Sequence, residues 1–155
     1  MRTDTLKNKR QDGGFIETHC AVAVPDLNGR VTLYSATQVP HYVQRNVAMV
    51  LGLELSKLRV VKPYVGGGFG PKAEATPLDY CSTALALITG KPVKMAYTRE
   101  QVFLHSRARH QFIHEMTTGV TKDGKLLALK HRAILDGGAY TSFGIATVYY
   151  SGSLL

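Results

Sequence analysis

The chain has few cysteines and no long apolar run. Its 155 residues include two cysteines, too few to supply the four ligands of a structural zinc or iron–sulfur site. We expect Cys20 and Cys81 to be free thiols of a cytosolic protein, with a single disulfide as the alternative. No stretch approaches the ~20 apolar residues of a membrane span. The polar start of the chain also lacks the apolar core of a secretory signal. These absences together predict a cytoplasmic protein.

Acidic residues are also scarce, with 11 Asp and Glu against 19 Lys and Arg, which gives a net charge of +8. Such a balance suggests a nucleic-acid-binding protein as one hypothesis. No RNA- or DNA-binding motif accompanies the basic residues, so we expect solvated basic faces with some anion contacts. A hydrophobic content of 45% indicates a globular chain and excludes a disordered tail.

Turn and capping residues predict a mixture of strands and helices. Apolar and alternating segments predict strands at 15–24, 30–35, 58–64, 93–97, 111–121 and 125–136. Helical spacing with Pro near the start and Gly after the end predicts helices at about 40–51 and 76–89. Because strands and helices do not alternate strictly, the expected fold class is α+β.

The two ends of the chain differ from the rest. We expect residues 1–14 to form a flexible basic segment and residues 15–155 to form a partial domain. The apolar C-terminal stretch ends on Leu154-Leu155 with no terminating residue, so we expect a domain truncated at that end.

A glycine-rich loop follows the strand at 58–64, with the sequence Gly66-Gly67-Gly68-Phe69-Gly70-Pro71-Lys72. A P-loop requires glycine at position 71 and a hydroxyl residue at 73, but Pro71 and Ala73 stand there. The dinucleotide fingerprint fails at position 71 as well. Two interpretations stay open: a backbone surface that presses against a flat or anionic cofactor, and a tight turn between strand and helix.

Several motifs in order resemble the molybdenum hydroxylases, the xanthine dehydrogenase and aldehyde oxidase family. The matching segments are Val60–Lys72, Ser35-Ala36-Thr37-Gln38, Ile16-Glu17-Thr18-His19, Tyr97-Thr98-Arg99-Glu100, Arg109-His110 and Lys122-Asp123-Gly124-Lys125. Within this family, residues 37–43 and 136–155 look most like the large subunit of 4-hydroxybenzoyl-CoA reductase.

The resemblance implies a molybdenum ion held by a molybdopterin, extended to the cytosine dinucleotide. It places [2Fe-2S] clusters and FAD in an iron–sulfur subunit and an FAD subunit, with ferredoxin as an example of the electron-transfer partner. It implies that Gln38 donates its amide to an oxo ligand of the metal, with no direct metal ligand from this chain. Gly67, Gly68, Phe69 and Gly70 correspond to the cofactor-binding loop, and Phe69 also to a wall of the substrate pocket.

The same resemblance implies two alternative reactions. One is reductive removal of the para hydroxyl of 4-hydroxybenzoyl-CoA, which gives benzoyl-CoA and needs a proton donor; Tyr140 and Tyr149 are the candidates, with Tyr150 beside them. The other is hydroxylation of a purine or an aldehyde, whose glutamate base the family places in a later domain. Aromatic core packing is the competing explanation for the tyrosines.

Overall fold

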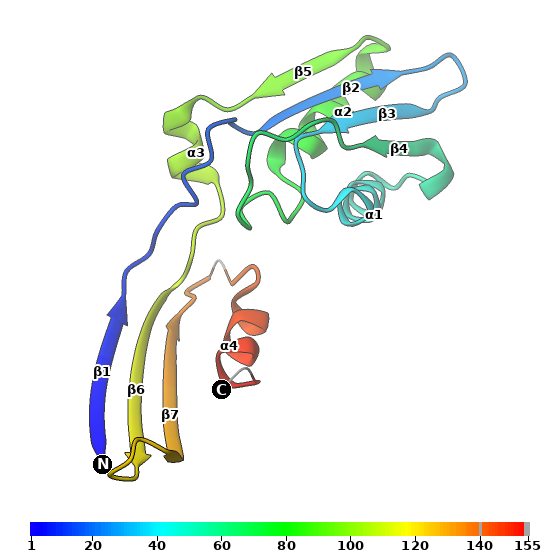
Figure 1. The fold of residues 1–155 in the computed structure, drawn as a ribbon. Helices are drawn as coiled ribbons and strands as arrows, with labels where there is room; N and C mark the ends of the chain where they lie inside the picture. Colours follow the sequence, from blue (N-terminus) through cyan, green and yellow to red (C-terminus); the bar gives the residue numbers. More distant parts are fainter. Residues whose placement is uncertain (140, 154–155) are drawn as a thin grey trace. The chain divides into compact units, whose positions relative to one another are not determined.

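The computed structural model describes residues 1–139 and 141–153 of the chain (Figure 1). These residues form two units. One unit is Asp12–Arg107, and the other joins Met1–Gln11 to Ala108–Leu155.

The unit Asp12–Arg107 is built on a four-stranded sheet with the order β4-β3-β2-β5. The strands are β2 (Cys20–Pro25), β3 (Val31–Ser35), β4 (Leu58–Val61) and β5 (Val93–Ala96). The β2–β3 pair is an antiparallel hairpin, as the Asn-Gly turn predicts. Strand β4 pairs in parallel with β3, after a connection through α1 (Pro40–Leu51) and the short 3-10 helix η1 (Leu55–Lys57).

The helix boundaries confirm the capping signals in the sequence. Helix α1 ends at Gly52, whose φ of 64° is left-handed, and α2 (Pro77–Thr89) ends at Gly90 with the same φ. Thr98 and Gln101 form a capping box at the start of α3 (Arg99–His105). The N-cap of α1 is Val39, whose N–H donates to the Thr37 hydroxyl at 3.1 Å.

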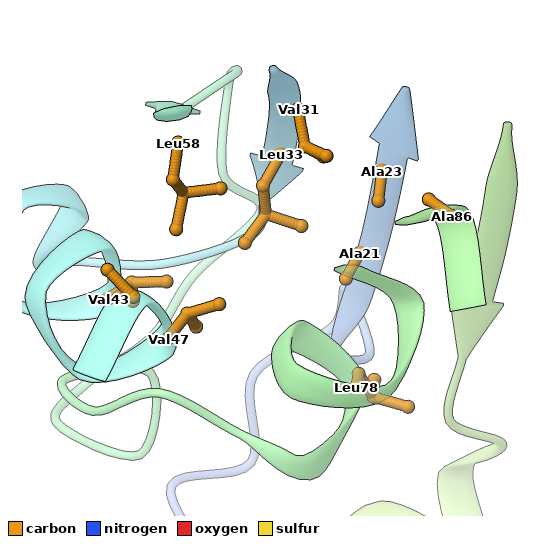
Figure 2. Close-up of a cluster of buried hydrophobic side chains, with 10 residues drawn as sticks. Ala21, Ala23, Val31, Leu33, Val43, Val47, Leu58, Leu78 and Ala86 are labelled. Atoms are coloured by element: carbon orange, nitrogen blue, oxygen red, sulfur yellow. The ribbon is translucent and has the colours of Figure 1, made fainter. Parts of the chain in front are cut away.

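Helices α1 and α2 cover the same face of the sheet, and the core lies between them and the strands (Figure 2). Its buried side chains are Ala21, Ala23, Val31, Leu33, Val43, Val47, Ala48, Leu58, Leu78 and Ala86. Burial along α2 does not follow the polarity of its side chains. Asp79, Ser82 and Thr83 are buried, whereas Ile88 is 79% exposed. Burial of Thr83 is tolerated because its hydroxyl donates to Asp79 O at 2.7 Å.

The other unit contains a three-stranded antiparallel sheet with the order β1-β6-β7. Its strands are β1 (Arg2–Asn8), β6 (Gln111–Val120) and β7 (Leu126–Asp136), and helix α4 (Gly144–Ser153) follows. Strands β6 and β7 confirm the two strands predicted at 111–121 and 125–136 and pair with each other in an antiparallel hairpin, whereas the sequence predicts no helix at 144–153.

The N-terminal segment corrects an expectation from the sequence. We expected residues 1–14 to be flexible, but Arg2–Asn8 is an edge strand that pairs with Phe112–Thr118. The segment is polar and mostly exposed, so no apolar alternation marks it as a strand. Strand β2 likewise begins at Cys20, and residues 15–19 before it are irregular. The expected α+β class holds for the described residues.

Candidate functional site

The glycine loop lies between β4 and α2, and part of its backbone is left-handed. Gly67 and Gly70 have φ values of 95° and 103°, and Phe69 has a φ of 52°. A left-handed φ is costly for a side chain as bulky as phenylalanine. Phe69 is nevertheless 76% exposed, so burial of its ring is not what holds it there.

The loop leaves several backbone donors free. No described residue accepts a hydrogen bond from the N–H groups of Gly67, Gly68 or Phe69. Gly68 is buried. Consecutive free amides of this kind form a surface that suits an electron-rich partner.

Gln38 lies in the turn between β3 and α1 and is bonded to this loop at two points. Its backbone N donates to Lys72 O at 2.8 Å, and its side-chain Oε1 accepts from Gly70 N at 2.9 Å. Thr37 beside it donates its hydroxyl to the same Lys72 carbonyl at 3.1 Å. The structure therefore brings together Gln38 and the loop glycines, which the sequence separates by about 30 positions.

The bond from Gly70 fixes which way the Gln38 amide faces. Since a backbone N–H can only donate, the atom facing Gly70 must be the oxygen, and Nε2 must point away. No described residue accepts a hydrogen bond from this Nε2. Gln38 is exposed, so it presents a neutral, non-titrating donor beside the loop.

Gly68 gives the amide the room it needs. A Cβ added to Gly68 would lie 2.5 Å from Gln38 Oε1, which no real contact tolerates. The packing of the amide against the loop therefore requires glycine at this position.

Beneath the loop lies an ion pair that the sequence analysis missed. Lys72 is fully buried, and its Nζ lies 2.6 Å from Glu17 Oε2. The same oxygen accepts from Gly66 N at 2.9 Å. Partial burial by itself raises the pKa of Glu17, but the bonds from Lys72 and Gly66 outweigh it and hold the pKa below its usual 4.5. The signal was present in the motif Glu17-Thr18-His19, but its partner stands 55 positions away.

Aromatic and cationic groups complete the surroundings of this pair. The Lys72 ammonium lies 4.9 Å from the centre of the Phe15 ring, and Arg99 donates to the carbonyls of Phe15 and Ile16 at 2.7 and 2.6 Å. Burial lowers the pKa of His19 from its ordinary 6.5, and the charge of Lys72 lowers it further. His19 is therefore neutral at pH 7.

Of the tyrosine candidates, Tyr149 belongs to the unit Met1–Gln11 and Ala108–Leu155, whereas the glycine loop belongs to the unit Asp12–Arg107. Tyr149 lies on α4, in the other unit, and is 70% exposed. Its ring meets that of Tyr150 edge-on at 5.9 Å between centroids. Tyr140 lies outside the described residues.

Two kinds of ligand, a metal ion held by protein side chains and a phosphate group, can be compared with this geometry. Within residues 1–139 and 141–153, no three His, Cys, Asp or Glu side chains come together as a metal site. The loop also offers no lysine to a phosphate group, because the Lys72 ammonium forms an ion pair with Glu17. The loop provides free backbone N–H groups and glycine surfaces without side chains. Gln38 beside the loop provides a side-chain amide. These features fit a pterin cofactor whose metal is held by the cofactor itself.

We refer to Gln38 and the loop 66–72 together as the cradle. The fold and this cradle indicate a cofactor-binding domain, and comparison with known proteins identifies its family. The molybdopterin cofactor-binding domain family matches residues 1–155. The chain belongs to this family, within the xanthine dehydrogenase and aldehyde oxidase group of molybdenum-dependent oxidoreductases.

Relatives of known name agree with this assignment. The chain is 39% identical over 145 residues to the nicotinate dehydrogenase large molybdopterin subunit of Eubacterium barkeri, covering 94% of this chain and 34% of that protein. It is 36% identical over 129 residues to a putative xanthine dehydrogenase molybdenum-binding subunit of Escherichia coli K12, covering 83% of this chain and 17% of that protein. The chain thus spans about a third of the first relative and about a sixth of the second.

Solved structures share the fold. Quinoline 2-oxidoreductase from Pseudomonas putida 86 superposes with a TM-score of 0.82 at 34% identity, over 90% of this chain and 18% of that one. Aldehyde oxidoreductase from Desulfovibrio gigas gives 0.85 at 28% identity, over 92% and 16%. None of the described helices is long and apolar enough to cross a membrane.

Proposed function

We propose that this chain forms part of the cofactor-binding wall of a molybdenum enzyme that hydroxylates an aromatic nitrogen heterocycle. The names of three relatives support this substrate class, because they refer to nicotinate, xanthine and quinoline. In such a reaction water supplies the oxygen, a ring C–H becomes C–OH, and two electrons and two protons leave. The bound molybdenum group would supply this two-electron redox chemistry.

Gln38 is the residue of this chain that contacts the metal's oxygen ligand in our proposal. The observation behind it is the bond from Gly70 N to Gln38 Oε1 at 2.9 Å, which turns Nε2 outward as a donor. An amide suits this task because it donates without titrating. Its charge state therefore stays the same at every pH at which the enzyme works.

The loop is proposed to hold the pterin. The free N–H groups of Gly67, Gly68 and Phe69 would donate to it, while the glycines let the ring approach the backbone. Phe69 is proposed to line the substrate pocket, because its exposed ring projects from the same loop and suits a flat aromatic substrate.

The remaining cofactors belong to the whole enzyme. We propose that the pterin carries a cytosine dinucleotide and that electrons pass to [2Fe-2S] and FAD groups in an iron–sulfur subunit and an FAD subunit, and on to an acceptor such as ferredoxin. This proposal follows from the family resemblance.

A second candidate is reductive dehydroxylation of 4-hydroxybenzoyl-CoA. It is supported by the resemblance of residues 136–155 to that reductase and by the exposure of Tyr149, whose phenol is free to reach a substrate. In this reaction two electrons and two protons enter, and the para hydroxyl leaves as water. Tyr149 and Tyr140 would be the proton donors.

The test uses the full-length enzyme, purified without oxygen together with its partner subunits. Molybdenum and pterin are measured first, by elemental analysis and by fluorescence of the oxidised pterin. Turnover is then measured with nicotinate, xanthine, quinoline, benzaldehyde and, with a low-potential reductant, 4-hydroxybenzoyl-CoA. We expect molybdenum and pterin to be present and a heterocycle to be the best substrate. Reduction of the thioester with no heterocycle turnover would replace the first candidate by the second.

A further inference from the structure

We propose that the ion pair between buried Lys72 and half-buried Glu17 is a positioning device that holds the glycine loop and Gln38 in their working geometry. This inference rests on the proposed function, in which Gln38 and the loop face the cofactor. Lys72 and Glu17 act through the loop backbone and are not catalytic residues themselves.

The first step is that one carboxylate connects the two ends of the loop. Glu17 Oε2 accepts from Gly66 N at the start of the loop and from Lys72 Nζ at its end, at 2.9 and 2.6 Å. Glu17 N also donates to Gly66 O at 3.2 Å. The segment 66–72 is thereby closed into a ring through Glu17, which reduces the number of conformations open to its four glycines.

The second step is that Lys72 also holds Gln38. Its carbonyl accepts from Gln38 N at 2.8 Å and from the Thr37 hydroxyl at 3.1 Å. The side chain of Lys72 therefore fixes the start of the loop while its backbone fixes Gln38. A shift of Lys72 would therefore move both the glycine loop and Gln38.

The third step is that burial makes the arrangement stiff. The Lys72 side chain has 0% exposure, and that of Glu17 has 35%. A buried ammonium without its counter-ion is strongly disfavoured, so states in which Glu17 swings away are rare. Glu17 is also packed closely against the loop on one side, because a Cβ on Gly66 would meet Glu17 Cβ at 2.7 Å.

The experiment measures hydrogen–deuterium exchange of the Gly66 and Gly70 amides in the full-length protein. Four variants are compared with the wild type: E17D, E17Q, K72R and the double variant E17Q/K72M. The double variant contains neither charge, so it avoids an unpaired buried ion and is expected to fold. E17D keeps the charge but withdraws the carboxylate by one methylene.

We expect exchange at Gly66 and Gly70 to rise about tenfold in E17Q/K72M, because hydrogen bonds to a charged group are lost or weakened. E17D should lie between this variant and the wild type. In the loaded enzyme, kcat per bound molybdenum should fall about tenfold or more while KM changes little, as expected when geometry and not substrate binding is lost. The Lys72→Arg variant, which keeps the cation, should retain a higher kcat than E17Q/K72M.

The matched control is Glu115→Gln, which breaks the exposed Arg132–Glu115 pair of 3.3 Å. It should leave loop exchange and kcat unchanged. The proposal is overturned if the double variant folds with wild-type exchange at Gly66 and Gly70, or if kcat falls with no change in exchange. Failure of the heterocycle assay alone would refute the proposed substrate class and leave the exchange result standing.

Discussion

At the scale of single residues, the orientation of the Gln38 amide makes the sharpest prediction. Gln38→Glu preserves size and the acceptor facing Gly70 N, but it replaces the outward donor by an acceptor with a negative charge. We expect kcat per bound molybdenum to fall by about 10² to 10³, the usual loss when one placed donor is removed. Single-turnover kinetics with measured molybdenum content would test this. Gln111→Glu, on the exposed start of β6, is the control, and an equal loss there would contradict the assignment.

Gly68 provides a steric test of the same contact. In Gly68→Ala the new methyl would lie 2.5 Å from Gln38 Oε1 and 2.9 Å from its Cδ, so the amide must move. We expect bound molybdopterin and activity to fall severalfold, with a smaller change in thermal stability because Gln38 is exposed and has space to move.

Gly152→Ala is the matched control for this substitution, since nothing lies within 4 Å of its added Cβ. There the exchange of glycine for alanine within helix α4 should be neutral or slightly stabilising. Equal cofactor loss in both variants would show that contact with Gln38 is not the cause.

His19 predicts how stability depends on pH. Its pKa is lowered by burial in the folded chain, so the unfolded chain takes up the proton first. The contribution is complete above about pH 6.5 and decreases as the pH falls below that value. Replacing the ring by Phe between Phe15 and Tyr97 should flatten this part of the profile. Urea unfolding at several pH values measures it, and the exposed His41→Phe variant should keep the wild-type slope.

At the scale of elements, the start of α2 depends on one carboxylate. Asp79 is 2% exposed, and its Oδ2 accepts from Thr76 N and Thr76 Oγ1 at 2.7 and 2.9 Å. Asp79→Ala removes the acceptor and leaves partly buried donors unpaired. We expect a loss of about 1–3 kcal/mol in the free energy of unfolding. Glu100→Ala, in the exposed first turn of α3, should cost less than about 1 kcal/mol, and chemical denaturation would compare the two.

Elements with local signals were predictable from the sequence, and elements with distant partners were not. Gly52 and Gly90 mark helix ends because the left-handed turn is a property of the residue itself. Strand β1 has no such signal, since its partner β6 lies more than 100 positions away and its polar side chains show no apolar alternation. The same reasoning explains the site. The glycine loop is visible as a motif, whereas the link between Lys72 and Glu17 exists only after folding.

At the scale of the whole molecule, the net charge of +8 already counts every carboxylate, but several of the cations are engaged by other groups of the chain. Arg2, Lys72 and Arg132 each form an ion pair with a carboxylate, and Arg99 is occupied by two backbone carbonyls. The positive charge is also distributed over both units. Fewer cations are therefore open to contact phosphates than the count of 19 Lys and Arg suggests.

This distribution predicts the result of a nucleic-acid binding assay. We expect the protein to bind duplex DNA and single-stranded RNA no more tightly than about 10⁻⁶ M at physiological salt, the range of non-specific binding. Fluorescence anisotropy with labelled oligonucleotides would measure this, repeated at several salt concentrations. A dissociation constant in the nanomolar range, with a steep decrease in affinity as salt rises, would show that many basic side chains contact phosphates together. Such a result would revive the nucleic-acid hypothesis, because the proposed cofactor site alone does not provide that many contacts.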